Sequence, residues 1–236
     1  MNYDIVIIGG GMVGQAFALS MAKTNSKIAI IEPNNPNPIL GDAHHTRVSA
    51  ITPTSEKLLK NIGAWDLIKR KHAFANTSVW DQNSHGSLDF HAQDESLDHL
   101  GHIIENDVIQ SALFTALEKT NIEFISAKLD SIEKTHEGYQ VTLDSNQTLD
   151  CQLLIGADGA RSRVRDLASI EFSENNYQQK AIVCNIKSLQ GFKDTTWQRF
   201  LSDSIIALLP LSEHQASIVW SAENTLADEL MQLSKE

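Results

Sequence analysis

The chain opens with apolar runs on either side of a glycine-rich turn, and these predict a strand, a helix and a second strand. Residues 5–8 (IVII) are apolar and β-branched, as in a strand buried on both faces. Residues 12–23 place apolar side chains at helical spacing, and residues 27–31 form a second apolar strand that ends at Glu32. The Pro/Asn-rich residues 33–38 predict an irregular loop.

The middle of the chain alternates between helical and strand-like patterns. Thr52 and Pro53 suit the cap and first position of a helix, and Gly63 suits its end. We expect a short helix over residues 65–71, a β-hairpin over 77–92 turning at 84–86, and a helix over 106–119. Strands are expected near residues 122–126, 129–134, 139–143 and 149–155.

The last third is β-rich. Its alternating and apolar segments predict strands at residues 180–186, 197–201, 205–209 and 216–220, followed by a short helical tail from Leu226. The chain therefore begins as an α/β fold and ends mostly as β, with an earlier hairpin inserted in the α/β part.

Composition narrows the possible functions. The 236 residues are 42% hydrophobic, which is ample material for a core and disfavours intrinsic disorder. The formal net charge of −11 disfavours generic nucleic-acid binding. Cys151 and Cys184 have no metal-ligand or disulfide-framework spacing. With neither an export signal nor an apolar span, we expect a cytoplasmic protein, and peripheral contact with a membrane stays open.

The glycine-rich turn has the spacing of a phosphate-binding loop. Residues 9–14 (GGGMVG) fit G-x-G-x-x-G: Gly9 permits the tight turn, Gly11 lets a pyrophosphate approach the backbone, and Gly14 lets helix and strand pack closely. The amino end of the following helix offers N–H groups to phosphates. Glu32 stands where a carboxylate would accept hydrogen bonds from a ribose. We predict dinucleotide binding; the alternative is that the glycines serve only a tight turn.

A second glycine-flanked turn lies at residues 156–165 (GADGARSRVR). An apolar strand at residues 153–155, predicted to be buried, delivers Asp158 into the turn, and a basic helix is expected directly after it. Such a turn can set a carboxylate and several backbone N–H groups against a cofactor. By residue pattern alone, a strand, a turn and a surface helix without a ligand would fit as well.

These motifs, in their order and spacing, resemble the FAD-dependent aromatic hydroxylases of the para-hydroxybenzoate hydroxylase type. The shared features are the glycine turn with Glu32, residues 47–51 (RVSAI) and residues 156–165. Within this superfamily the chain is most similar to the ubiquinone-biosynthesis hydroxylase branch, in which Glu105-Asn106, residues 197–200 (WQRF) and residues 209–211 (LPL) also agree.

The resemblance implies a Rossmann-like FAD-binding domain of the glutathione-reductase type, with an interleaved β-rich substrate domain. The FAD-binding domain would comprise residues 1–75 and 100–172, and the substrate domain residues 76–99 and 173–236. Glu32 would hold the adenosine ribose, and Arg47 would reach the pyrophosphate or ribose region of FAD. Gln110 would contact the flavin side of the cofactor. Asp158 belongs to the family's second sequence fingerprint, which is associated with both FAD and the reduced nicotinamide. The cofactor-binding residues that we predict are Gly9, Gly11, Met12, Val13, Gly14, Glu32, Arg47, Gln110, Asp158 and Gly159.

One family feature is missing from the sequence. Chains of this family carry a third sequence fingerprint: a Gly-Asp pair that follows a late strand and comes before a glycine-rich helix start. No such pair in that setting occurs up to Glu236. Gly41-Asp42 is a Gly-Asp pair, but it lies in a loop with no strand before it and no glycine-rich helix after it. We therefore expect the chain to be the N-terminal portion of a longer enzyme, with both domains incomplete.

The activity implied by the resemblance is hydroxylation of the ring of a polyprenylated phenol in ubiquinone biosynthesis, through a flavin hydroperoxide, with NAD(P)H as reductant and dioxygen as co-substrate. We assign no catalytic residue. Two alternatives stay open: a related FAD enzyme, such as an epoxidase or a prenyl reductase, and a non-catalytic flavoprotein fragment or subunit of a biosynthetic assembly.

The histidines are the remaining candidates for chemistry. His99 and His102 could be combined with Asp98 or Glu105 into a metal site, but no helix is predicted there to align them, and we predict no metal. The aromatic residues of the later strands, Trp197 among them, are expected to pack in the core or to line a substrate cavity.

Overall fold

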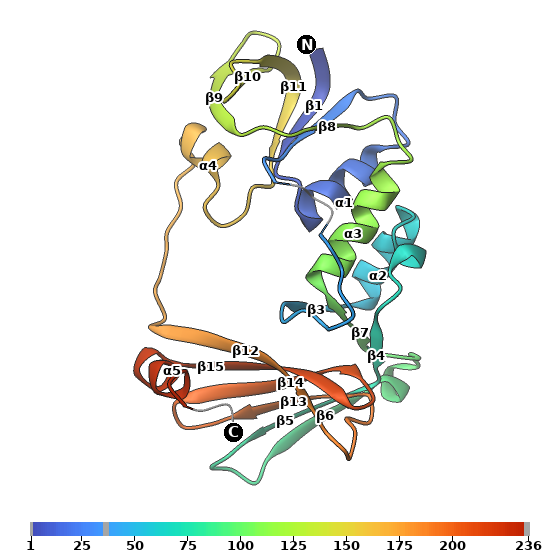
Figure 1. Ribbon diagram of the computed structural model, residues 1–236, viewed down its shortest axis with the longest axis vertical. Coiled ribbons are helices and arrows are strands. Elements are labelled where there is room, and N and C mark those ends of the chain that lie inside the picture. The colour runs from blue at the N-terminus through green and yellow to red at the C-terminus, as the bar shows by residue number, and fades with distance from the viewer. Residues whose placement is uncertain (1, 35–37, 234–236) are drawn as a thin grey trace. The chain divides into compact units, whose positions relative to one another are not determined.

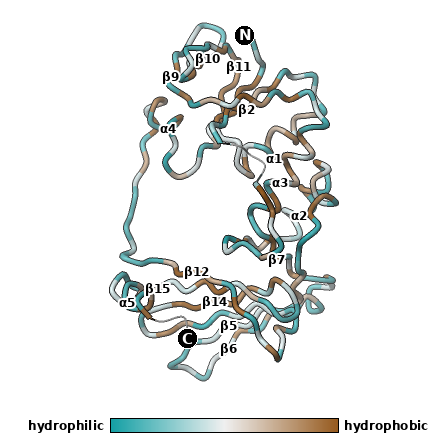
Figure 2. The backbone as a smooth tube through the Cα atoms, in the orientation of Figure 1, coloured by the Kyte–Doolittle hydropathy of each residue, from teal (hydrophilic) through white to brown (hydrophobic). Residues whose placement is uncertain are grey.

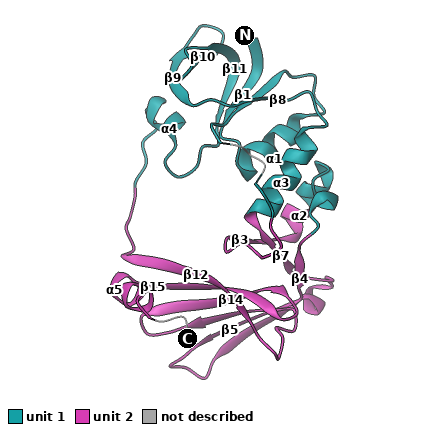
Figure 3. Cartoon of the chain, in the orientation of Figure 1, with its two compact units in different colours: residues 1–40, 57–69, 107–173 teal, residues 41–56, 70–106, 174–236 magenta. Residues whose placement is uncertain are grey.

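The chain starts with the predicted strand, glycine turn, helix and second strand (Figure 1). These are β1 (Asn2–Ile8), α1 (Met12–Met21) and β2 (Ile28–Ile31). The computed structural model describes residues 2–34 and 38–233, so part of the predicted loop at 33–38 lies outside the described residues. The described residues form two compact units, coloured separately in Figure 3.

The first unit is built on a six-stranded sheet with the order β8-β2-β1-β11-β10-β9. Strands β8, β2, β1 and β11 run parallel, and β10 and β9 complete the sheet in antiparallel pairing. Its later members are β8 (Glu123–Ile125), β9 (Leu129–Lys134), β10 (Tyr139–Leu143) and β11 (Thr148–Gly156), with helices α3 (Asn106–Leu117) and α4 (Arg163–Leu167).

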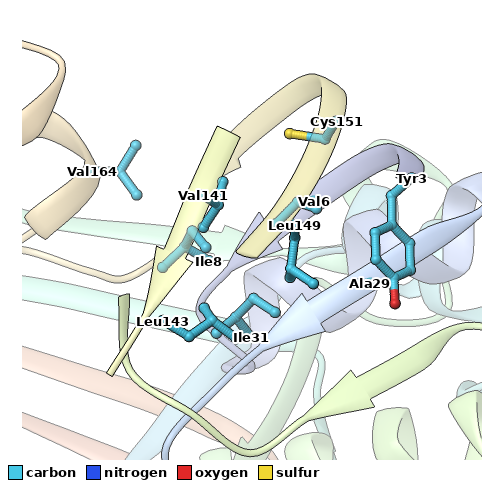
Figure 4. Close-up of a cluster of buried hydrophobic side chains, with 10 residues drawn as sticks. All are labelled: Tyr3, Val6, Ile8, Ala29, Ile31, Val141, Leu143, Leu149, Cys151 and Val164. Carbon is cyan, nitrogen blue, oxygen red and sulfur yellow. The ribbon is translucent and has the colours of Figure 1, made fainter. Parts of the chain in front are cut away.

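Both faces of β1 are buried, as its apolar sequence predicts. Ile5 and Ile7 alternate with Val6 and Ile8, and all four side chains are at most 5% exposed. Figure 4 shows one cluster of this core, with side chains from β1, β2, β10 and β11 and with Val164 of α4. This burial fixes the strand from which the glycine turn leaves. Not every strand residue is buried, however: Leu153 of β11, predicted to lie in a buried strand, is 46% exposed.

The second unit contains a six-stranded sheet and a three-stranded sheet. The larger has the order β12-β15-β14-β13-β5-β6 and the smaller the order β3-β7-β4. The larger sheet comprises β5 (Asn76–Asp81), β6 (Ser87–His91), β12 (Gln179–Lys187), β13 (Thr195–Phe200), β14 (Ser204–Ser212) and β15 (Gln215–Glu223), with α5 (Asn224–Leu230) after it. The smaller comprises β3 (Val48–Ile51), β4 (His72–Phe74) and β7 (Gly101–Glu105).

The early hairpin joins the late strands, which confirms the interleaved fold that was predicted. β5 pairs in parallel with β13, so that Ser78 lies opposite Trp197 and Trp80 opposite Arg199. Every residue of β2 in the first unit and of β7 in the second is buried, and Figure 2 shows the hydrophobic run along β2.

The boundaries of the compact units fall at different residues from the boundaries of the predicted domains. The first unit comprises residues 1–40, 57–69 and 107–173, and the second residues 41–56, 70–106 and 174–236. The boundary thus falls within α2 (Pro53–Asn61) and at the start of α3. The functional division into residues 1–75 with 100–172 and 76–99 with 173–236 stays a prediction.

Most predicted elements are confirmed within two or three residues, and the differences concern the shortest segments. Only a 3₁₀ turn at Trp65–Leu67 forms in the predicted helix over 65–71. Strands β3, β4 and β7, and a 3₁₀ turn at Ala92–Glu95, were not predicted. These segments lack a clear alternation of apolar and polar residues, and partner strands decide their conformation. No helix among the described residues is long and apolar enough to cross a bilayer.

Candidate functional site

The two glycine-flanked motifs meet at the carboxyl end of the parallel strands in the first unit. β1 and β11 pair in register, with Ile8 opposite Gly156, and the Ala157 amide donates to the Ile8 carbonyl at 2.7 Å. On the other side, the Gly9 amide donates to the carbonyl of Ile31 at 2.9 Å. Open parallel sheets bind their ligands at this edge. Segments far apart in the sequence therefore contribute to one candidate site.

Gly9 and Gly14 are required by close backbone packing. Gly9 has φ +108°, and a Cβ there would lie 2.3 Å from the carbonyl oxygen of Ala157. A Cβ on Gly14 would lie 1.9 Å from the carbonyl oxygen of Gly9. Real Cβ atoms do not tolerate such distances, so both positions need glycine to bring α1 and the second motif against the turn.

Gly11 has the opposite environment, as a ligand-facing glycine should. A Cβ at this position would meet no atom within 4 Å, and its backbone is extended, with φ −73° and ψ −175°. Gly11 begins α1 without a side-chain cap, and no acidic residue lies in the first turn. The space beside the positive end of the helix is thus open to an anion. Met12 and Val13 form the first turn there, and Val13 is 73% exposed.

Glu32 connects the end of β2 to the glycine turn. Its Oε2 accepts a hydrogen bond from the Gly10 amide at 2.9 Å, and its Oε1 accepts from the backbone and side chain of Asn34 at 2.9 and 3.0 Å. A carboxylate has about four acceptor sites, so the half-buried Glu32 keeps capacity for ribose hydroxyls. The predicted ribose ligand lies at the edge of the glycine turn.

Asp158 holds the start of α4. Its Oδ2 accepts from the amides of Arg163 and Val164 at 2.6 and 3.1 Å, and its Oδ1 accepts from the Ser162 hydroxyl at 2.6 Å. The carboxylate therefore offsets the positive end of the helix and fixes the turn. Gly159 follows with φ +85° and open space around it.

Arg47 and Gln110 lie in different units. Arg47 is an exposed residue of the second unit directly before β3, and its carbonyl accepts from the Asn106 amide at 3.0 Å. Gln110 is a half-buried residue of α3 in the first unit. Their predicted contacts with a cofactor stay predictions.

An ion pair that sequence reasoning missed fixes the segment before Arg47. Arg70 binds Glu105 at two points, with 2.6 Å from Nε to Oε2 and 2.8 Å from Nη2 to Oε1. Arg70 also donates to the carbonyl of Gly41 at 2.7 Å, and the His45 amide donates to Glu105 at 2.7 Å. Glu105 is 1% exposed, so its charge is matched by three donors in the core of the second unit.

Gln15 and Gly10 are further residues that sequence reasoning missed. Gln15 is fully buried on α1, and its Nε2 donates to the Gly10 carbonyl at 2.7 Å. A Cβ on Gly10 would lie 2.7 Å from that of Glu32, so this glycine is also required by packing. The available signal for Gln15 was one polar residue among apolar neighbours directly after Gly14.

The arrangement has the chemistry that a dinucleotide requires: an uncapped helix amino end beside open backbone, a carboxylate at the end of the next strand, and a second glycine turn with open space at Gly159. It defines a nucleotide-binding fold of the type found in flavoproteins. Residues 2–235 match the FAD binding domain family. The chain therefore belongs to this family of FAD-binding domains, and the predicted cofactor, FAD, is confirmed.

Curated relatives agree with the predicted branch of the superfamily. The chain is 36% identical over 254 residues to the mitochondrial ubiquinone biosynthesis monooxygenase COQ6 of Mus musculus, covering 99% of this chain and 53% of that protein. It is 34% identical over 223 residues to the 3-demethoxyubiquinol 3-hydroxylase of Escherichia coli (strain K12), covering 92% of this chain and 56% of that protein. The chain thus spans about half the length of these relatives.

A solved structure shows the same fold. The crystal structure of PqsL of P. aeruginosa in complex with 2-aminobenzoylacetate superposes with a TM-score of 0.80, covering 98% of this chain and 64% of that one. The sequences are 17% identical, so this likeness concerns the fold alone.

Proposed function

We propose that the chain is the FAD-binding portion of a flavin-dependent monooxygenase that hydroxylates the aromatic ring of a polyprenylated phenol in ubiquinone biosynthesis. The observation that carries the proposal is the open amino end of α1 at Gly11, set between Glu32 and the Asp158 turn. The ubiquinone-biosynthesis relatives supply the substrate class.

The residues of the site would each hold a different part of FAD. The amides at Gly11, Met12 and Val13 would bind the pyrophosphate, because the positive helix end and the missing Cβ favour a close anion. Glu32 would accept hydrogen bonds from the adenosine ribose. The open backbone at Gly159 would let the second motif approach the cofactor closely.

Arg47 and Gln110 complete the proposed set. A guanidinium at Arg47 would neutralise pyrophosphate charge, and the Gln110 amide would offer hydrogen bonds on the flavin side. The ion pair of Arg70 with Glu105 is a positioning contact, because it holds the Gly41–His45 segment from which Arg47 follows.

Bound FAD, reduced by NAD(P)H, would supply the oxygen-activating chemistry. The protein would orient the substrate ring and exclude water, and we assign no residue of the chain to proton transfer. The larger sheet of the second unit is the proposed substrate side. There Trp80 and Trp197 make an edge-to-face contact with 6.0 Å between ring centroids, and both are half-buried.

A second candidate function is supported by the length comparison. Because the chain spans about half of its relatives, it would bind FAD without completing turnover by itself. A related FAD enzyme with another prenylated substrate, such as an epoxidase or a prenyl reductase, would use the same site.

Spectroscopy and product analysis separate these readings. The 236-residue chain is purified, incubated with FAD, desalted and examined for visible flavin absorption, then treated with NADH or NADPH under nitrogen. Retained flavin that is bleached, with an oxygen atom added to a prenylated phenol in air, supports the monooxygenase. Retained flavin without product supports the second candidate, a chain that binds FAD but does not complete turnover by itself. A colourless folded protein contradicts both candidates.

A further inference from the structure

We propose that Glu56, His99 and His102 form a binding site for a divalent cation of the zinc class. One ligand atom from each of the three residues lies within 4.8 Å of the other two. All three belong to the second unit, and none is among the residues assigned to FAD. The proposal is therefore independent of the proposed function.

The distances suit a small metal ion. His99 Nε2 lies 2.8 Å from Glu56 Oε2, and His102 Nδ1 lies 3.2 Å from the same oxygen. Zinc–ligand bonds of about 2.0 to 2.1 Å at tetrahedral angles separate ligand atoms by roughly 3.3 Å. The two distances from histidine nitrogen to the Glu56 oxygen need to open by about 0.1 to 0.5 Å, which side-chain rotation supplies. The two imidazole rings lie edge to face, with 4.4 Å between their centroids.

Two of the three ligands are held by regular structure. Glu56 lies in the first turn of α2, where its amide donates to the Thr52 carbonyl at 2.9 Å. His102 lies in β7, the central strand of the smaller sheet, opposite Ile51 on one side and Ala73 on the other. A site whose ligands come from paired strands and helices is preorganised for binding.

The cluster is buried except at His99. Glu56 and His102 are 7% and 9% exposed, whereas the His99 side chain is 25% exposed. An ion would reach the cluster past His99, and a water molecule would complete four-coordination, as in zinc sites with three protein ligands. Burial also lowers the local dielectric response, which strengthens the attraction between the Glu56 carboxylate and a cation.

The donor set selects the class of ion. Two imidazoles and one carboxylate suit zinc and its neighbours in the first transition series, whereas magnesium and calcium prefer sites made only of oxygen. The sequence offers Asp98 or Glu105 as the carboxylate beside the two histidines, and no metal was predicted from it. Glu105 instead binds Arg70, and the carboxylate that reaches the histidines comes from Glu56, 43 residues before His99.

Metal titration tests the site directly. The chain, prepared without a histidine tag and treated with EDTA, is titrated with Zn²⁺ by calorimetry. Co²⁺ then serves as a spectroscopic probe of four-coordinate nitrogen and oxygen ligands. We expect one ion per chain and, in His99→Ala, binding weakened by about tenfold or more, since even outer-shell changes cost 10- to 100-fold. His85→Ala, at an exposed position in the hairpin turn, is the matched control and should bind as the unmodified chain does.

A second variant keeps the test decisive if one substitution disturbs folding. Glu56→Gln retains size and hydrogen bonding but removes the charge, and circular dichroism reports whether each variant is folded. Absence of Zn²⁺ binding by the unmodified chain would overturn the proposal and leave Glu56 as the ion-pair partner of two imidazoles. Unchanged affinity in folded His99→Ala and Glu56→Gln would overturn it equally, because the ion would then be bound elsewhere.

Discussion

The Glu32 carboxylate accepts a hydrogen bond from the amide of Gly10, with 2.9 Å between Oε2 and the nitrogen. The acid that follows β2 is therefore fixed against the turn that follows β1. This contact orients one face of the carboxylate and leaves its remaining acceptor sites for a ligand. It places the ribose-binding group and the phosphate-binding turn of the proposed FAD site in one rigid arrangement.

Replacing Glu32 tests the ribose contact. We expect Glu32→Ala to weaken FAD binding by roughly tenfold to a hundredfold, because a hydrogen bond to a charged group contributes about 1.5 to 3 kcal/mol. Flavin fluorescence quenching measures the dissociation constant. Glu118→Ala, at an exposed position in the same unit, serves as the control. Equal affinities for FAD in the two variants would remove Glu32 from the site.

Gly11 allows a test in which folding and binding separate. A Cβ at Gly11 meets no protein atom, and its φ of −73° suits any residue, so Gly11→Val should change the stability of folding by no more than about 1 kcal/mol. FAD retention should be lost, because the side chain occupies the space where the pyrophosphate approaches the backbone. Gly86→Val, in the exposed hairpin turn where a Cβ would meet only Ser84 Oγ at 3.5 Å, should retain FAD. A Gly11→Val protein that stays yellow after desalting would rule out the phosphate-loop assignment.

Asp158 and Ser162 distinguish a cofactor role from helix capping. Both residues support the start of α4, since Asp158 accepts from two helix amides and the Ser162 hydroxyl accepts from the Arg165 amide at 3.0 Å. Each change to alanine should lower the free energy of unfolding by about 0.5 to 2 kcal/mol. Only Asp158→Ala should also weaken FAD binding. If Ser162→Ala weakens it as much, the contribution of Asp158 is structural.

The ion pair between Arg70 and Glu105 makes a prediction about stability. Arg70→Met leaves Glu105 buried without its cation and should cost about 3 kcal/mol in urea unfolding, the lower end of the range for broken buried pairs. The double variant Arg70→Met/Glu105→Leu should recover most of that loss. Lys180→Met breaks the exposed pair with Asp228 and should cost less than about 1 kcal/mol. Similar losses of unfolding free energy in Arg70→Met and Lys180→Met would contradict the burial of Glu105.

Tyr3 predicts a stability change at high pH. Burial, followed by a hydrogen bond to Glu123, raises the pKa of Tyr3 from 10.0 to about 12. The folded state thus keeps the proton that the unfolded state releases, so this contribution is complete below pH 10 and is lost as the pH rises towards 12. Urea unfolding at pH 8 and pH 11 should show a smaller decrease for Tyr3→Phe than for the unmodified chain. An identical decrease would contradict the raised pKa.

The regular elements were predictable where apolar and polar residues follow a clear strand or helix period. β9 and β10 have the predicted bounds, and α1 begins at the predicted residue. The strands β3, β4 and β7 were not predicted, because their sequences do not alternate clearly between apolar and polar residues and their partners decide the conformation. The pairing of β5 with β13 joins segments far apart in the chain, and only the motif resemblance indicated that the hairpin belongs with the later strands.

The sequence by itself determined the glycine turn, the acid that follows β2 and the second motif, because each depends on local backbone requirements written in consecutive residues. These predicted dinucleotide binding, and the family resemblance that they carry predicted FAD and the class of fold. Only the tertiary structure decided which carboxylate goes to which partner. Glu105 binds Arg70, Glu56 lies against two histidines, and Asp158 accepts from the amides of α4. Such pairings depend on distances between residues that strand register and burial bring together, and no local pattern encodes those distances.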